Sequence, residues 1–390
     1  MIWNLIHDQT CRAAGDWAAV WGREFRRTAV YLDHAFPAGP PSPKWATEAR
    51  TLPINGTVQL RIAASEVDAG IPALIVTPQV NHSYIADFEP DQSLVRTLLS
   101  AGFGRVAVTD WLPPLDRRPY GIADSIDDIR FCIEALGGRV HLVGLCQGGW
   151  QSAIVAELHA DAVVSLTVAA APIDTSVGTT GLDLFVRGLP MAAYEWIVFA
   201  GGGRAPGSAL SCGFDLLRPD ERFVGNYRDL YLNALDPEYV ERYDRIRNWY
   251  RLNKDVAGEL YLEVVRDLFK GNRLARGTMR IRDRTVDLGA IRCPVFLVGG
   301  TEDHITPVAQ VMALRALAPR APCRTWTVKA GHVGVFMGRT ALRTVWPEIA
   351  AGMLGSKLGS AAARRRFQSA GKPAHSKGAR NSIDMPAAIE

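Results

Sequence analysis

Short apolar runs rich in β-branched residues alternate with longer, helix-compatible stretches along much of the chain. The stretches near 91–100, 122–136 and 150–158 predict helices. The apolar runs predict buried strands at 71–77, 105–110, 140–143 and 162–169, and two further strands at 291–300 and 324–328. Strands that alternate with helices in this way predict an α/β fold, a mostly parallel sheet with helices on both faces.

This strand pattern is interrupted between residues 176 and 290. The sequence there favours helices, as in PEYVERYDRIRNWYRLN and VAGELYLEVVRDLFKGN, and glycines at 201–203 separate the helical stretches. We expect a large helical lid inserted into a core formed by 51–175 and 291–354. A lid of this size favours a large or apolar substrate, because it supplies walls that exclude water. Its aromatic residues Trp196, Trp249 and Tyr261 are expected to pack between helices rather than to contact substrate.

The two ends of the chain are predicted to lie outside this core. Residues 1–50 are expected to form an N-terminal helical segment. The net charge of +4 is concentrated in residues 355–390, where seven basic and two acidic residues accompany Ala, Ser and Gly. This basic tail is predicted to be disordered, because it has little apolar surface to bury. It is interpreted as a solubilising extension, and no nucleic-acid partner is expected.

The remaining composition indicates a chain that folds in a reducing compartment. Its 390 residues and 48% hydrophobic content suffice for a large core. The six cysteines follow no CxxC or pairing rhythm, which argues against a zinc site or a disulfide framework. No signal peptide or run of about 20 apolar residues is evident, so no transmembrane segment is expected. A cytoplasmic location is predicted.

The segment VGLCQGGW at 143–150 carries the strongest chemical signal. A cysteine between glycines, after a β-branched run and before a helical stretch, is typical of a nucleophile elbow with sulfur as the nucleophile. Such a strained turn requires small residues at Gly144 and Gly148, and the helix that follows favours an anion at its N-terminus. Cys146 is therefore the predicted nucleophile; the alternative is a buried structural cysteine.

Two candidate partners follow late strands in the chain order typical of α/β-hydrolases. Asp303 lies in TEDHITP after the strand predicted at 291–300, and His332 lies in KAGHVGVF after the strand at 324–328. His332 is expected to take the thiol proton, while Asp303 holds the imidazole in position and stabilises its charged form. His304 is expected to be a loop residue, because neighbours on an extended segment point to opposite sides.

The oxyanion donors are predicted at two places. The backbone amide of Gln147, directly after the nucleophile, would be the first donor. The second is expected near Val80 to His82, with Asn81 as the named residue, because this segment follows the first long strand. No GxGxxG, phosphate-binding loop or metal-spaced cluster is present, so no nucleotide or metal cofactor is predicted.

Taken together, several of these segments resemble polyhydroxyalkanoate synthases, which have an α/β-hydrolase fold. The resemblance rests on IPALIV, VNHSYIADFEPDQSLVRTLLSAGF, HLVGLCQGG, VDLGAIRCPVFLVGGTEDHITP and GHVGVFMG, and it extends to about Leu354. The chain is most similar to the short, two-component synthases. This resemblance implies Cys146 as the acyl-carrying nucleophile, Asp303 as the acid and His332 as the base. It also implies a 3-hydroxyacyl-CoA substrate with coenzyme A as leaving group, a polyester product, and a granule surface, partner subunit or second copy as partner.

Other interpretations remain open. PIDTSVG, VAGELYLEVVRDLFKGNRLARGTM and GHVGVF also resemble intracellular polyhydroxybutyrate depolymerases, in which water would accept the acyl group. A cysteine hydrolase of the dienelactone type has a similar elbow but lacks a large lid. A granule-binding protein without activity is the alternative from a different class. Acyl chain length and the direction of the reaction are not predicted.

Overall fold

The computed structural model describes residues 2–36, 42–66, 70–113, 119–217 and 224–356, with side chains from residue 16 onward. It divides into two units. The smaller unit consists of residues 1–42 and 212–252, and the larger of residues 43–211 and 253–390. The predicted tail lies outside the described residues beyond Ser356, so its disorder stays a prediction.

The larger unit is built on an eight-stranded sheet with the order β1-β2-β6-β3-β7-β8-β13-β14. The pairs β1–β2 and β2–β6 are antiparallel, and the other neighbours are parallel. This confirms the predicted mostly parallel sheet. The strands are β1 (Arg50–Pro53), β2 (Val58–Ala64), β3 (Ala73–Val76), β6 (Arg105–Trp111), β7 (Val140–Leu145), β8 (Val163–Ala169), β13 (Val295–Gly300) and β14 (Cys323–Val328).

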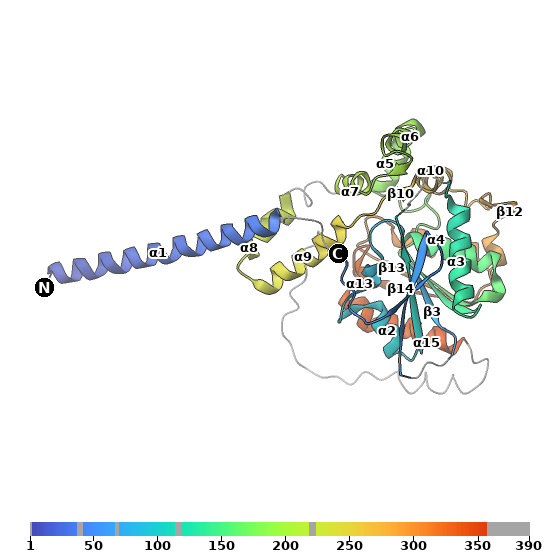
Figure 1. Cartoon of the computed structure of the whole chain (residues 1–390), viewed down its shortest axis with the longest axis horizontal. Coiled ribbons are helices and arrows are strands. Elements are labelled where there is room, and N and C mark those ends of the chain that lie inside the picture. The colour runs from blue at the N-terminus through green and yellow to red at the C-terminus, as the bar shows by residue number, and fades with distance from the viewer. Residues whose placement is uncertain (1, 37–41, 67–69, 114–118, 218–223, 357–390) are drawn as a thin grey trace. The chain divides into compact units, whose positions relative to one another are not determined.

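Helices cover both faces of this sheet, as predicted (Figure 1). On one face α2 (Leu94–Ser100) packs against α15 (Trp346–Gly355), and on the other α3 (Ile122–Ala135) packs against α4 (Gln147–Leu158). Shorter helices follow the last two strands, namely α11 (Val308–Met312), α12 (Leu314–Leu317), α13 (Gly334–Met337) and α14 (Arg339–Thr344). Three two-stranded ribbons complete this unit: β4 (Asp87–Glu89) with β5 (Gln92–Ser93), β9 (Arg204–Ala205) with β10 (Val256–Ala257), and β11 (Arg280–Ile281) with β12 (Arg284–Thr285).

The core lies between the sheet and these helices. Every residue of β3 and β7 is buried, which explains why β3 is a continuous apolar run and why β7 has a single polar side chain, His141. Trp150 and Trp346 are the largest fully buried side chains, and the Trp346 indole N–H donates to the Val335 carbonyl at 2.9 Å. Strands β1 and β2 are absent from the predicted strands, because Gln59 and Arg61 interrupt the apolar pattern of β2, whose residues are alternately buried and half-buried.

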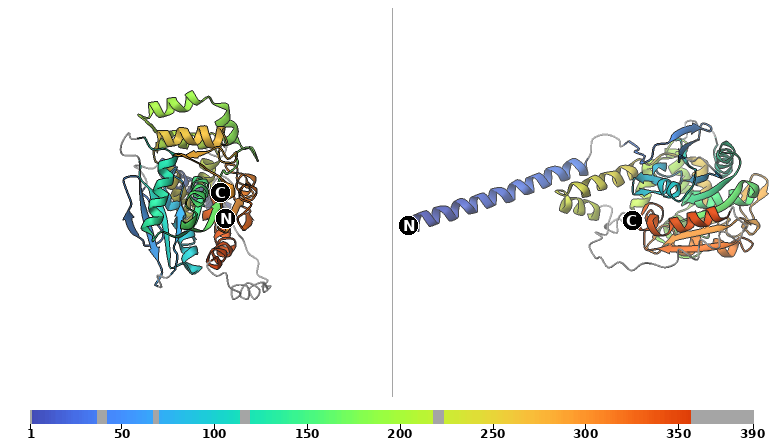
Figure 2. Two further views of the ribbon diagram at one scale, coloured as in Figure 1. Left: turned by 90° about the vertical axis from the view of Figure 1, so that its right-hand side faces the viewer. Right: turned by 90° about the horizontal axis from the view of Figure 1, so that it is seen from below.

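The inserted segment is helical, as predicted, but it is shared between the two units. The larger unit holds α5 (Gly181–Gly188), α6 (Met191–Ala200), α10 (Gly258–Glu263) and a π-helical turn at Val264–Lys270. The left view of Figure 2 shows these green and ochre helices together beyond one end of the strands. Helix α7 (Gly207–Asp215) crosses the boundary between the units, and α8 (Asn226–Asn233) and α9 (Pro237–Arg251) belong to the smaller unit.

The predicted packing of the lid aromatics holds for two of the three residues. Trp249 is buried, and the half-buried Tyr261 lies 6.0 Å from Tyr194, measured between ring centroids. Trp196, in contrast, is 67% exposed on α6, so the packing interpretation is wrong at that position.

The smaller unit joins α1 (Ile2–Ala35) to α8 and α9. Its core includes Leu230 and Tyr243, and His34 on α1 contacts Asp244 on α9 at 2.6 Å. The helix predicted over residues 1–50 ends at Ala35; residues 42–49 are not helical, and Arg50 begins β1. None of the helices in the described part of the chain is long and apolar enough to cross a membrane.

A polar contact between Thr175 and Asn272 joins the beginning and the end of the insertion within the larger unit. The buried Thr175 N–H donates to Asn272 Oδ1 at 3.1 Å, and Asn272 Nδ2 donates to Asp174 Oδ1 at 2.7 Å. Asn272 has a left-handed backbone with φ of 47°, a conformation that asparagine tolerates better than most residues. This side chain therefore fixes the base of the insertion.

We expect Asn272→Ala to lower the free energy of unfolding by about 3 kcal/mol, because it leaves the buried Thr175 N–H without an acceptor and because alanine tolerates the left-handed backbone less well than asparagine. Asn272→Gly is the matched control: it loses the same hydrogen bonds without the backbone strain, so its loss should be nearer about 2 kcal/mol. Urea unfolding measures both. An alanine variant as stable as the wild type would contradict this role.

Candidate active site

Cys146 lies in the tight turn between β7 and α4. Its φ of 51° and ψ of −116° are strained for a residue with a side chain, as expected for a nucleophile elbow. The turn is held by the Cys146 N–H, which donates to the Ala169 carbonyl at 2.9 Å. A Cβ on Gly148 would lie 2.1 Å from the Val76 carbonyl oxygen, and one on Gly144 would lie 2.4 Å from the Gly148 carbonyl oxygen. Only glycine fits these two positions.

Asp303 and His332 follow β13 and β14, so the two residues predicted from distant motifs lie together. The His332 Nδ1 and Asp303 Oδ2 atoms are 2.8 Å apart, and both side chains are buried. The second oxygen of Asp303 accepts the N–H groups of Ile305 at 2.9 Å and Thr306 at 2.8 Å. The carboxylate is therefore fixed from both sides and holds the imidazole by one nitrogen.

Cys146 is close enough to His332 to influence its ionisation, so carboxylate, imidazole and thiol follow one another in space. Burial by itself would lower the pKa of His332. The negative charge of Asp303 and the interaction with Cys146 outweigh burial and raise this pKa well above its ordinary value. The arrangement can therefore hold a proton on His332 while the sulfur carries negative charge.

The two predicted oxyanion residues differ in their surroundings. Helix α4 begins at Gln147, so the Gln147 N–H is in the first turn, where helical amides have no partner within the helix. The Asn81 N–H, in contrast, already donates to Asn253 Oδ1 at 3.0 Å. The Gln79 N–H is likewise occupied, by Gln147 Oε1 at 3.0 Å.

Between these two occupied amides lies Val80, whose N–H has no hydrogen-bond acceptor among the residues that the structure describes. Val80 is within the predicted segment and replaces Asn81 as the better candidate for the second donor. A sequence motif could not separate the two, because the difference is made by Asn253, far away in the chain.

A cavity of about 430 Å³ lies beside this loop and is lined by Gln79, Tyr120 and Lys254 among others. Burial lowers the pKa of Lys254, although Asp110 partly opposes the shift. Burial and the charge of Lys254 lower the pKa of His82 to about 4, so this imidazole is neutral at pH 7. The sequence pattern does not single out Lys254 or Asp110, because they lie far apart in the chain.

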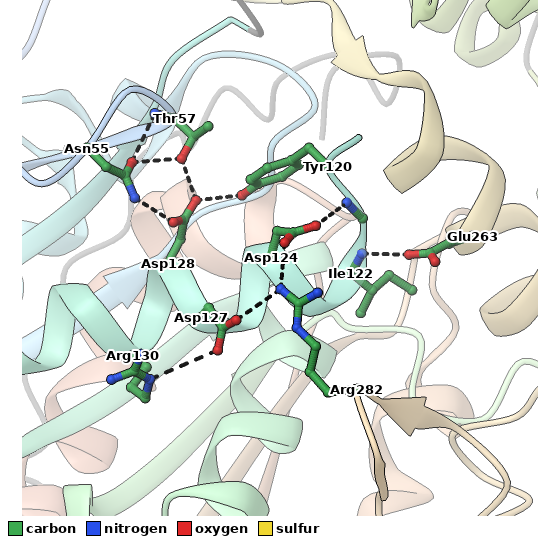
Figure 3. A network of polar contacts seen from close by, with 11 residues as sticks. Asn55, Thr57, Tyr120, Ile122, Asp124, Asp127, Asp128, Arg130, Glu263 and Arg282 are labelled. Atoms are coloured by element: carbon green, nitrogen blue, oxygen red, sulfur yellow. Dashed lines mark hydrogen bonds and ion pairs between the residues drawn. The ribbon is translucent and has the colours of Figure 1, made fainter. Parts of the chain in front are cut away.

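The wall of this cavity includes a polar network at the start of α3 (Figure 3). Asp128 accepts hydrogen bonds from Asn55 at 2.6 Å, Thr57 at 2.5 Å and Tyr120 at 2.7 Å. From the insertion, Glu263 accepts the Ile122 N–H at 2.6 Å and so caps α3. Among the described residues, no group of three or more His, Cys, Asp or Glu side chains is arranged to hold a metal ion.

Comparison with known proteins gives relatives of one kind. The chain is 30% identical to the "Poly(3-hydroxyalkanoate) polymerase subunit PhaC" of Synechocystis, over 72% of this chain and 76% of the relative. It is 30% identical to the PhaC subunit of Haloferax mediterranei, over 73% of this chain and 59% of the relative, and 29% identical to that of Thiocystis violacea, over 71% and 79%. The chain thus spans about three fifths of the length of its haloarchaeal relatives.

Two further matches concern the fold and an uncharacterised family. A carboxylesterase structure from the thaumarchaeon Nitrososphaera gargenis matches with a TM-score of 0.50 and 17% identity, over 76% of this chain and 96% of that chain. This likeness, together with the strand order, confirms the α/β-hydrolase fold. Residues 132–316 match a family described as "Protein of unknown function (DUF3141)".

Cys146 should react with iodoacetamide before the other cysteines whose side chains are described, because it alone has an imidazole partner. Burial raises the pKa of Cys132, of Cys323 and, to about 11, of Cys293, so these thiols should react slowly. Peptide mass spectrometry with limiting reagent measures the order of labelling.

The exposed Cys212 is the internal control for this experiment. His332→Gln should slow labelling at Cys146 about tenfold, since an unassisted thiol is only a few per cent thiolate at pH 7, and should leave labelling at Cys212 unchanged. Faster labelling at Cys132 or Cys293 than at Cys146 in the wild type would refute the assignment.

Replacing the carboxylate should lower the pKa of His332. The Asp303→Asn variant loses the charge that opposes burial, so its imidazole should titrate at a lower pH than that of the wild type. NMR of protein with labelled histidine measures this pKa, and Asp283→Asn, on an exposed turn, is the control. Equal His332 pKa values in Asp303→Asn and wild type would show that Asp303 does not set the charge of the site.

Proposed function

Because the chain belongs to the poly(3-hydroxyalkanoate) polymerase subunit PhaC family, we propose that it is an acyltransferase that moves 3-hydroxyacyl groups from coenzyme A thioesters onto a growing polyester. The observation that carries the proposal is the His332 imidazole, hydrogen-bonded to Asp303 and interacting with Cys146, with the three residues at the carboxyl ends of β7, β13 and β14 of a family member.

In the first step Cys146 accepts the acyl group. Its proton passes to His332, and the thiolate attacks the carbonyl carbon of the thioester. The amides of Gln147 and Val80 stabilise the oxyanion, and such a donor typically contributes about 3–4 kcal/mol. The bond from carbon to the sulfur of coenzyme A then breaks, and His332 returns the proton to the departing thiolate. One thioester replaces another, so the exchange is nearly balanced in energy.

In the second step a hydroxyl group attacks the acyl-enzyme. His332 removes the proton of the terminal hydroxyl of a second hydroxyacyl unit, and the new ester bond forms as the bond to Cys146 breaks. Asp303 keeps the imidazole oriented and stabilises its charged form in both steps. If water takes the place of the hydroxyl, the same intermediate yields a free hydroxy acid, which is the depolymerase or thiol-esterase reaction.

The insertion is proposed to decide between these acceptors by limiting the access of water to the acyl-enzyme. The contact between Thr175 and Asn272 supports this role, because it keeps the base of the insertion ordered beside β8. The exposed aromatic residues of α6, Trp196 and Phe199, support contact with an apolar polymer.

A partner subunit and a granule-associated, cytoplasmic location are part of this proposal. The relatives are named as polymerase subunits. Helix α1 exposes Trp17, Trp21 and Phe25 at spacings of four residues, an apolar stripe typical of a helix that binds another helix. A second copy of the chain is the alternative partner.

Replacing the nucleophile separates its chemical role from folding. We expect Cys146→Ala to lose at least about a thousandfold in turnover of 3-hydroxybutyryl-CoA, because no acyl-enzyme can form, and to keep its thermal midpoint. Release of the coenzyme A thiol measures turnover. The control is Cys212→Ala, an exposed cysteine outside the site, which should keep full activity.

The products decide the direction of the reaction. A wild type that converts 3-hydroxybutyryl-CoA into polymer supports the proposal. A wild type that yields only free hydroxy acid and degrades preformed amorphous polymer would replace it with the depolymerase function. Substantial activity in Cys146→Ala would overturn the nucleophile and both of these reactions.

A further inference from the structure

Two glutamine side chains join the oxyanion loop to the nucleophile elbow. The Gln79 backbone N–H donates to Gln147 Oε1 at 3.0 Å, and Gln147 Nε2 donates to Gln79 Oε1 at 2.9 Å. Gln79 directly precedes Val80, and Gln147 directly follows Cys146. We infer that this reciprocal pair is a clasp that sets the distance between the two oxyanion donors, so that Gln79 and Gln147 act as positioning residues for acylation. The inference rests on the proposed function.

The orientation of the Gln79 amide is fixed by its other neighbours. Its oxygen also accepts Gln151 Nε2 at 3.2 Å, while its nitrogen faces Tyr120 OH and Ser125 Oγ at 3.4 Å each. Gln151 in turn donates to Ser125 at 2.7 Å. An amide oxygen with two donors has no reason to exchange places with its nitrogen. Gln79 is therefore held in one orientation by residues of α3 and α4.

Burial makes this pair strong. Gln79 is 8% exposed, and Gln151 and Ser125 are fully buried, whereas Gln147 is half-buried, so water is largely kept from the Gln79 side of the pair. If Gln147 is lost, the Gln79 N–H is left without an acceptor, and if the Gln79 side chain is lost, the amides of Gln147 and Gln151 each lose an acceptor. The loop that carries Val80 would then move away from α4, and a displacement of about 1 Å typically costs about 100-fold in rate.

The clasp predicts a specific kinetic signature. Acylation of Cys146 by an ester or thioester develops an oxyanion, whereas alkylation by iodoacetamide needs the same nucleophile but no oxyanion donor. Gln79→Met and Gln147→Met should therefore lower the rate of acylation about 10- to 100-fold and leave the rate of alkylation unchanged. The double variant should be no slower than Gln147→Met, because that substitution already removes both hydrogen bonds of the clasp, whereas Gln79→Met removes only the one donated by the Gln147 amide.

Both rates are measured on the full chain, acylation with 4-nitrophenyl butyrate and with 3-hydroxybutyryl-CoA, alkylation by mass spectrometry of the Cys146 peptide. Gln59→Met is the matched control: it removes a glutamine amide that donates to Asp110 at 2.9 Å on β2, and it should leave both rates unchanged. Acylation and alkylation that fall together, effects that multiply in the double variant, or single variants that acylate at the wild-type rate would each overturn the clasp.

A charged variant provides a second test that does not depend on the methionine variants being folded. Gln147→Glu keeps the acceptor for the Gln79 N–H but sets a carboxylate oxygen against Gln79 Oε1. Protonation restores a donor at that position. The ratio of acylation to alkylation in this variant should therefore recover from about pH 8 to about pH 5, toward the range where carboxyl groups protonate, relative to the wild-type ratio. A ratio that follows the wild type at every pH would overturn the clasp.

The outcomes for the clasp and for the proposed function are distinguishable. If the nitrophenyl ester but not 3-hydroxybutyryl-CoA acylates the wild type, the proposed function fails while the clasp is still tested by the ester. If both reagents acylate the wild type and the glutamine variants equally, the clasp fails and the function stands. A wild type that neither reagent acylates would overturn both.

Discussion

The close approach of α4 to β3 is the constraint on which the site depends. Because the Val76 carbonyl lies where a Cβ of Gly148 would be, the first turn of α4 is pressed against the end of β3. This contact brings the amide after Cys146 near the loop that follows β3, although the two segments are about 70 residues apart in the chain. The strained backbone of Cys146 costs about 1–3 kcal/mol locally, and the packing of the fully buried strands β3 and β7 supports it.

The charge of Asp303 is the second feature on which the site depends. Asp303 has two backbone donors on one oxygen and the imidazole on the other, so its charge is already solvated by the protein. A buried imidazole without such a partner would stay neutral. With it, the pKa of His332 rises, and an ion pair between imidazolium and thiolate becomes available in a buried place. In the proposed reaction His332 alone then serves as base and as acid in turn, and Cys146 is the nucleophile.

The residues that lie at strand ends are those that the sequence predicts well. Cys146, Asp303 and His332 each follow a strand that the sequence predicts, and parallel strands bring such ends to one edge of a sheet. Predictions that depend on side chains from distant segments were poorer. The Asn253 side chain accepts a hydrogen bond from the Asn81 N–H, and the Gln147 side chain accepts one from the Gln79 N–H. Neither contact can be recognised from the sequence around either residue. One face of strand β2 is half-buried, and the side chain of Trp196 is exposed. Neither can be predicted from the number of apolar residues in the segment.

Residues 212–252 of the smaller unit are inserted between Ser211 and Asn253, which both belong to the larger unit and lie side by side there. Asn253 Nδ2 donates to Ser211 Oγ at 2.8 Å, so the last residue before that inserted part and the first residue after it are in contact. A loop whose ends already touch can change in length at little entropic cost to the fold that carries it. A change in residues 212–252 would therefore burden the larger unit little, whereas within the smaller unit it must preserve the packing of α8 and α9 with α1. Since Asn253 also holds the Asn81 amide, the junction next to such a change is in direct contact with the loop that carries the oxyanion donor.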